Sequence, residues 1–196
     1  MSEIVAVAAN RSEFNVVVTG GEGLNLQSND FQLFGLPEQF ELDAQQLEGR
    51  WKALQTQIHP DKFAAQGQAA QRLSMQWSVR INEAYQRLKA PITRGAYLCE
   101  LRGHPVRAED NTAMPSAFLM QQMEWREALE DSAGDAGELQ KLWVQTRAVQ
   151  TQYLLDLAQA LDDQRDAAQA ASCVRALMFI DKFSRSVAQR LDELDE

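Results

Sequence analysis

Two amphipathic stretches joined by a short segment constrain the fold of this sequence more than any other feature. After Asp43, a predicted helix N-cap, apolar residues recur at spacings of four, three and four, namely Leu47, Trp51, Leu54 and Ile58. From about Gln68, a second helical series consists of Leu73, Trp77, Ile81, Ala84 and Leu88. Because neither stripe can be buried alone, we expect an antiparallel helical hairpin.

The segment "IHPDKFA", residues 58–64, lies at the predicted tip of this hairpin. Pro60 ends the first helix because proline cannot continue it, and "DKFAAQGQAAQ" is predicted to be a loop that reverses the chain. His59 and Asp61 flank the proline, so an imidazole, a fixed φ angle and a carboxylate are presented together. The alternative is purely structural, with Pro60 as a helix stop and Asp61 as a cap.

The rest of the sequence predicts an all-α protein with two modules. Residues 1–29 combine β-branched residues with a Gly-Gly break, which predicts a loose extension with one short strand. The segment 104–114 contains Pro105 and no apolar period, so we interpret it as a linker. Predicted boundaries are therefore 1–29, 30–103, 104–114 and 115–196, the last a three-helix bundle with helices at 115–131, 137–161 and 165–194.

Composition excludes several classes of function. The chain has 196 residues, 45% of them hydrophobic, and a net charge of −9 that is concentrated after residue 96. This acidity argues against nucleic-acid binding, which requires clustered cations. No apolar run reaches the roughly 18 residues of a membrane span, and the N-terminus has no signal-peptide pattern, so we expect a cytoplasmic protein.

The sequence predicts neither a catalytic site nor a metal site. The sequence contains no GxSxG motif and no Gly-rich phosphate loop, so we expect no enzymatic activity. Cys99 and Cys173 are isolated and predicted to be buried, and His59 and His104 are the only histidines. These residues are too few for a typical metal site, and we expect neither a metal nor a cofactor.

The first helix of the second module carries apolar residues on two sides. At about 100° per residue, Phe118, Trp125 and Leu129 form the core stripe. A second group lies roughly 100° to 200° away and mixes apolar with acidic side chains, which is typical of a protein-binding surface: Leu119, Met120, Met123, Glu124, Glu127 and Asp131. Phe179 lies off the apolar stripe of the last helix and is predicted to join this surface. The alternative is that each helix of the bundle buries more than one stripe.

Several segments resemble the J-domain of DnaJ-type co-chaperones, in the variety found in the HscB family of iron–sulfur cluster assembly. These segments are "LFGLP", "LEGRWKALQTQIHPDKF" and "INEAYQRLKAPITRGAYL". In the second module, "SAFLMQQMEWREALED" and "LMFIDKFSR" resemble the HscB C-terminal domain. The resemblance extends from about Asp30 to the C-terminus.

This resemblance implies two partners. In the family, the HPD tip and the adjacent helix dock on an ATP-bound DnaK-type chaperone of the HscA kind and stimulate its ATPase. The matching positions here are His59, Pro60, Asp61 and Lys62, with Arg50 and Lys52 on the helix that usually supplies positive charge. Thr56 replaces a frequent basic residue, and Ile58 replaces a frequent aromatic one.

The other partner that the resemblance implies is the iron–sulfur scaffold protein IscU. It would bind the six residues of the second apolar and acidic group together with Phe179, although Asp131 is shorter than the acidic residue common in the family. The resulting hypothesis is a monomeric, non-enzymatic adaptor. Two alternatives stay open: a general J-protein for unfolded clients, and a metal-binding or redox protein that uses the cysteines and histidines.

Overall fold

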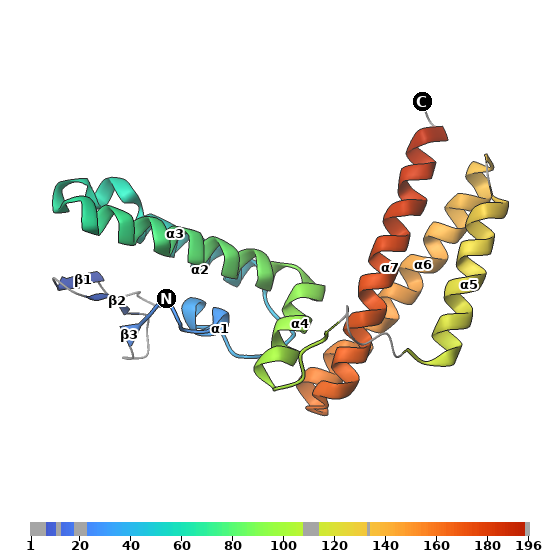
Figure 1. Cartoon of the computed structure of the whole chain (residues 1–196), viewed down its shortest axis with the longest axis horizontal. Helices are drawn as coiled ribbons and strands as arrows, with labels where there is room; N and C mark the ends of the chain where they lie inside the picture. Colours follow the sequence, from blue (N-terminus) through green and yellow to red (C-terminus); the bar gives the residue numbers. More distant parts are fainter. Residues whose placement is uncertain (1–6, 11–12, 18–22, 108–113, 133, 195–196) are drawn as a thin grey trace. The chain divides into compact units, whose positions relative to one another are not determined.

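The computed structural model describes residues 7–10, 13–17, 23–107, 114–132 and 134–194. The chain forms two compact units, Met1–Arg94 and Gly95–Glu196, so the boundary falls inside helix α4 (Pro91–Leu101). Most of the predicted linker, residues 108–113, lies outside the described residues. Figure 1 shows the elements of each unit.

The N-terminal region contains more strand than the single one that the sequence predicted. β1 (Val7–Asn10), β2 (Glu13–Val17) and β3 (Gly23–Leu24) form an antiparallel sheet in the order β1-β2-β3. Val16 is opposite Val7 on one side and Leu24 on the other. A single strand leaves its backbone N–H and C=O groups unpaired, and the two neighbouring strands satisfy them here.

The predicted helical hairpin is confirmed. Its elements are α2 (Ala44–Ile58), a 3₁₀ segment η1 (Pro60–Gln66) and α3 (Gln68–Lys89), and α2 and α3 lie side by side in Figure 1. The Asp43 carboxylate caps α2 by accepting the N–H groups of Gln45 and Gln46 at 2.8 and 3.2 Å. The buried seam between the helices contains most of the predicted stripes: Leu47, Leu54, Ile58, Trp77, Ile81, Ala84 and Leu88.

Trp51, which was predicted to be part of the buried stripe, lies at the edge of the interface between α2 and α3. Its ring is half-buried and stacks on Tyr85, with the ring centroids 4.6 Å apart. Its indole N–H donates to Asn82 Oδ1 at 3.0 Å, and Gln55 Nε2 donates to the same oxygen at 2.7 Å. An indole needs such an acceptor when most of its surface is covered, so the tryptophan fits a boundary position better than the core.

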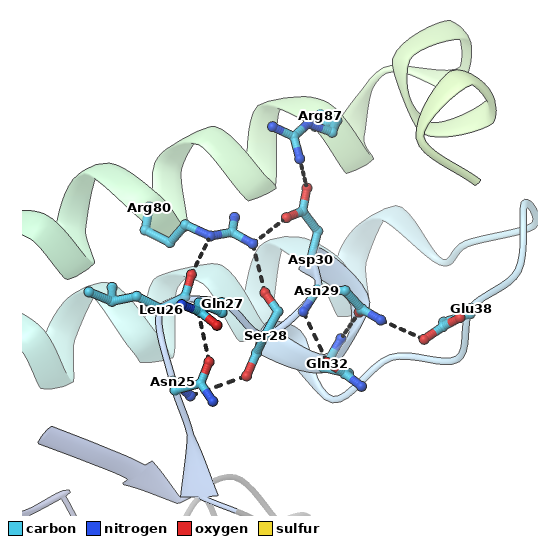
Figure 2. A network of polar contacts seen from close by, with 10 residues as sticks. All are labelled: Asn25, Leu26, Gln27, Ser28, Asn29, Asp30, Gln32, Glu38, Arg80 and Arg87. Carbon is cyan, nitrogen blue, oxygen red and sulfur yellow. Dashed lines mark hydrogen bonds and ion pairs between the residues drawn. The ribbon is translucent and has the colours of Figure 1, made fainter. Parts of the chain in front are cut away.

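A buried carboxylate joins the short helix α1 (Asp30–Phe34) to α3. Asp30 is fully buried, and its two oxygens lie 2.7 Å from Arg80 Nη2 and 3.0 Å from Arg87 Nη1 (Figure 2). The Asn29 side chain caps α1, because its Oδ1 accepts the Gln32 N–H at 2.8 Å. Two guanidinium groups thus compensate one desolvated charge, which fixes α1 on α3.

The second unit contains three long helices, as predicted. They are α5 (Ser116–Asp131), α6 (Ala136–Ala158) and α7 (Ala167–Leu194), and a π-helical turn, η2 (Gln159–Asp163), extends α6. α6 and α7 pack closely against each other, and α5 packs on them through its buried side chains (Figure 1). Their shared core consists of Phe118, Trp125, Leu129, Leu139, Leu142, Ala176, Ile180, Phe183 and Val187.

We predict that Asp30→Asn lowers the free energy of unfolding by about 3 kcal/mol, because it leaves two partly buried guanidinium groups without their anion. Urea denaturation at constant pH measures this change. Asp61→Asn is the matched control, since its side chain is 89% exposed and its loss should change stability by less than about 0.5 kcal/mol. Equal effects of the two substitutions would contradict the role assigned to Asp30.

Candidate partner-binding sites

The tripeptide His59-Pro60-Asp61 lies between two buried apolar residues. Ile58, the last residue of α2, is fully buried, and Phe63 in η1 is 4% exposed. Between them, the side chains of His59 and Asp61 are 57% and 89% exposed. The predicted exposure of both polar side chains is therefore observed, and the two flanking anchors hold the backbone that carries them.

Local hydrogen bonds give the tip a defined shape. His59 lies between α2 and η1 as the cap of both, and its carbonyl accepts the N–H of Lys62 at 2.9 Å. The Asp61 N–H donates to His59 Nδ1 at 3.4 Å, and Asp61 Oδ2 lies 3.4 Å from the same nitrogen. The stretch after the proline was predicted to be a loop, but it is a 3₁₀ helix, because the burial of Phe63 pulls the chain back onto the hairpin.

The structure does not bring the two predicted basic residues of α2 together. Arg50 and Lys52 are two positions apart, and such residues point to different sides of a helix. Lys52 is exposed and pairs with Glu48, with Nζ and Oε1 2.6 Å apart. This contact raises the pKa of Lys52 and lowers the pKa of Glu48. Arg50 extends instead toward Gly35, where a Cβ would lie 3.1 Å from its Nη1.

The apolar and acidic surface predicted on α5 is exposed. Leu119, Met120 and Met123 are 44%, 63% and 70% exposed, whereas the core stripe of the same helix is at least nine-tenths buried. The acidic residues of this surface are also exposed: Glu124, Glu127 and Asp131. We call these six residues the α5 face. Apolar side chains with this exposure, beside carboxylates, suit a partner that is both apolar and basic.

Phe179 is half-buried, so the outward orientation predicted for it is wrong in part. Its ring packs edge-on to Phe118 at 5.9 Å and stacks on Phe183 at 6.1 Å, where both distances join ring centroids. Phe179 and Phe183 are one turn apart and form a second apolar stripe on α7. A helix packed against two neighbours buries two stripes, which is the alternative that the sequence left open.

Arg126 is a residue of this region that the sequence analysis missed. Its guanidinium carbon lies 5.6 Å from the centroid of the Phe179 ring, a cation–π distance. Arg126 is seven residues after Leu119, so the helical period alone could have placed it beside the α5 face. The cation therefore borders a surface that is otherwise apolar and acidic.

Both cysteines are buried and free, as predicted. Burial raises the pKa of the Cys99 thiol and of the Cys173 thiol to about 11. In the described part of the chain, no three His, Cys, Asp or Glu residues are grouped in a way that could hold a metal ion. Within the same residues, no helix is both long and apolar enough to cross a membrane.

A helical hairpin with an HPD tip, followed by a helical bundle with an exposed apolar and acidic face, defines a J-domain co-chaperone. A family model described as the HSCB C-terminal oligomerisation domain matches residues 114–188. The co-chaperone protein HscB homolog of Burkholderia thailandensis is 46% identical over 174 residues, which are 88% of this chain and 99% of the relative. The homolog of Ralstonia nicotianae is 47% identical over 168 residues, 85% of this chain and 96% of the relative.

Solved structures agree with this relationship. Chaperone HscB from Vibrio cholerae has a TM-score of 0.73 and 37% identity, and the match covers 85% of this chain and 99% of that one. Human co-chaperone protein HscB has a TM-score of 0.79 over 85% of this chain and 83% of its own, and at 24% identity it shows the shared fold. The chain belongs to the HscB family of iron–sulfur cluster assembly co-chaperones. Because the matched family model is named for oligomerisation, the expected monomer stays a prediction.

We predict that both thiols react slowly with Ellman's reagent in the folded protein. With a pKa of about 11, roughly one thiol in 1,000 is ionised at pH 8, and only the thiolate reacts. The reaction should become at least about 100-fold faster in denaturant, where the pKa returns to about 8.5. Rapid reaction of the folded protein would instead favour the metal-binding or redox alternative.

The same pKa change predicts how stability depends on pH. Between about pH 9 and 11, the unfolded thiols lose their protons while the folded thiols keep them. The folded state then binds more protons, so the free energy of unfolding should fall as the pH rises through this window. Urea denaturation at pH 8 and pH 10 measures the difference, and replacement of both cysteines by Ala should reduce it.

Proposed function

We propose that this chain is a non-enzymatic adaptor with two partners. The α5 face holds an iron–sulfur scaffold protein of the IscU type, and the HPD tip engages a DnaK-type chaperone of the HscA kind and stimulates its ATPase. The observation that carries this proposal is the exposure of His59 and Asp61 between the buried anchors Ile58 and Phe63.

The shape of the tip supports an interaction with a protein surface. A flexible loop would lose conformational entropy on binding, whereas a tip anchored on both sides is already ordered. The imidazole of His59 can donate and accept hydrogen bonds, and the Asp61 carboxylate accepts them. The chaperone surface would therefore place hydrogen-bonding and cationic groups against the tip.

The charges on α2 suggest a modest electrostatic contribution to chaperone docking. Glu48 neutralises part of the charge of Lys52, and Arg50 lies on another side of the helix. Charges at the rim of an interface act mainly on the association rate and on its salt dependence. Lys62 is exposed next to the tip and is the basic residue best placed to steer the partner.

The α5 face supports binding of a protein that presents a basic and apolar surface. Exposed methionines adapt their shape to a partner, because their side chains have three rotatable bonds and a polarizable sulfur. The surrounding carboxylates favour cationic residues on the partner and disfavour acidic ones. This pattern differs from a general client-binding surface, which would be apolar without a charged rim.

Binding both partners on one chain would speed their encounter. Once both partners are held, their encounter with each other becomes effectively intramolecular, and their local concentration rises to about the millimolar range for short connections. Such an adaptor needs no catalytic group of its own. It favours the state of the chaperone in which ATP hydrolysis proceeds.

We predict that His59→Gln abolishes stimulation of the chaperone ATPase and leaves scaffold binding unchanged. The amide cannot reproduce both ring nitrogens, while the exposed position makes the substitution neutral for folding. A steady-state ATPase assay with and without scaffold measures the effect. His104→Gln is the matched control, since His104 is exposed after the end of α4 and should keep full stimulation. Retained stimulation by the His59 variant would remove the tip from the mechanism.

We also predict that Met120→Ser combined with Met123→Ser weakens scaffold binding at least about tenfold, because two exposed apolar contacts are lost. Calorimetric titration with the scaffold measures the affinity. The free energy of unfolding should change by less than about 1 kcal/mol, as expected for surface substitutions. Leu155→Ser on α6, which is 59% exposed, is the control and should bind the scaffold normally.

Phe179→Ala should behave differently from the methionine variants. Because its ring packs on Phe118 and Phe183, its removal should destabilise the second unit by about 1 to 3 kcal/mol in addition to any loss of binding. Chemical denaturation separates the two effects. Unchanged stability would show that these ring contacts contribute little in solution.

A further inference from the structure

The first unit contains an exposed apolar groove that the proposed function does not use. Leu26, Met75 and Val79 are 36%, 59% and 57% exposed and line a hollow of about 510 Å³. Met75 and Val79 are four residues apart on α3, so they form one ridge of the helix. The polar lining residues are Gln76, Arg80 and Glu83.

One wall of the groove is fixed by hydrogen bonds. The carbonyl of Asn25 accepts the Ser28 N–H at 3.0 Å, and Asn25 Oδ1 accepts the Gln27 N–H at 2.8 Å, so residues 25–28 form a tight turn. Arg80 donates to the carbonyls of Leu26 at 3.3 Å and Ser28 at 2.8 Å (Figure 2). The same guanidinium is held by the buried Asp30. Leu26 is therefore positioned against α3 and does not move freely.

The last residue of the N-terminal segment, residues 1–24, directly precedes the turn that forms this wall. β3 ends at Leu24, and only Asn25 separates it from Leu26. The segment is rich in aliphatic residues that could fill an apolar groove: Ile4, Val5, Val7, Val16, Val17, Val18 and Leu24. The segment has three Glu and one Arg, a net charge of −2. The charged residues that line the groove are Glu83 and Arg80, and Arg80 is paired with Asp30.

We propose that this groove is the docking site of the chain's own N-terminal segment, residues 1–24. The groove and the segment are both rich in apolar side chains, and their covalent connection at Asn25 supplies a high effective concentration. Docking would shield Met75 and Val79 from water and hold the three-stranded sheet next to α3. This inference is independent of the proposed function, because it involves neither the HPD tip nor the α5 face.

A second copy of the chain fits the groove less well. Stable interfaces between proteins bury about 800 Å² on each partner, and three partly exposed side chains supply only a fraction of that area. A tethered segment needs less contact area, since it loses little translational freedom on docking. The intramolecular occupant is therefore favoured.

Limited trypsin digestion of the full-length protein can test the proposal. Arg11 is the only Lys or Arg before Arg50, so cleavage after Arg11 reports specifically on the N-terminal segment. Val79→Glu places a like charge against the acidic segment and removes an apolar contact, at a position exposed enough to preserve the fold. We expect the initial rate of cleavage after Arg11, followed by mass spectrometry, to rise at least about tenfold in this variant.

The control variant is Val144→Glu on α6, which makes the same change at a side chain that is 53% exposed. It should be cleaved after Arg11 at the rate of the unmodified chain. Equal cleavage rates in all three proteins would overturn the proposal. So would a dimer of the unmodified chain that Val79→Glu dissociates in sedimentation equilibrium without a change in cleavage, since the groove would then bind a second copy.

Discussion

The burial of Ile58 and Phe63 on the two sides of the HPD tripeptide is the constraint on which the geometry of the exposed tip depends. Ile58 anchors the end of α2 in the seam with α3, and Phe63, inside the 3₁₀ segment η1, is buried where that segment packs on α3. Without both anchors, His59 and Asp61 would lie in an ordinary flexible loop. Apolar packing thus gives two fully polar side chains a fixed and exposed arrangement, which a docking motif requires.

In the second unit, α5 uses one side for packing in the core and another side for the proposed binding of a partner. One side of α5 contributes Phe118 and Trp125 to an aromatic core with Phe183 of α7, while another side leaves Met120 and Met123 in water. Packing of the buried side fixes the rotation of α5 about its axis, and this rotation sets where the exposed side chains lie. Recognition of a scaffold would therefore depend on a bundle whose stability comes from other residues, which is why binding and stability can be changed separately.

Regular periodicity made much of this fold predictable. The α2 cap at Asp43, the hairpin stripes and the core stripe of α5 follow from side-chain spacing, which is a local property. Predictions were less accurate where a side chain meets several elements at once. Trp51 was assigned to the core and lies at its edge, where it stacks on Tyr85 and donates to Asn82. Phe179 was assigned to the surface, but it is partly buried and its ring packs on Phe118 and Phe183.

The sequence by itself determined the helical class, the exposed HPD tip and the mixed apolar and acidic character of the α5 face, because each follows from residue type and helical period. Only the tertiary structure decided that Arg50 extends toward Gly35, that Asp30 joins α1 to α3, and that Leu26 forms a groove with α3. The physical reason is distance along the chain. These contacts join residues that are far apart in sequence, or depend on which neighbour a long side chain reaches, and no local pattern encodes that choice.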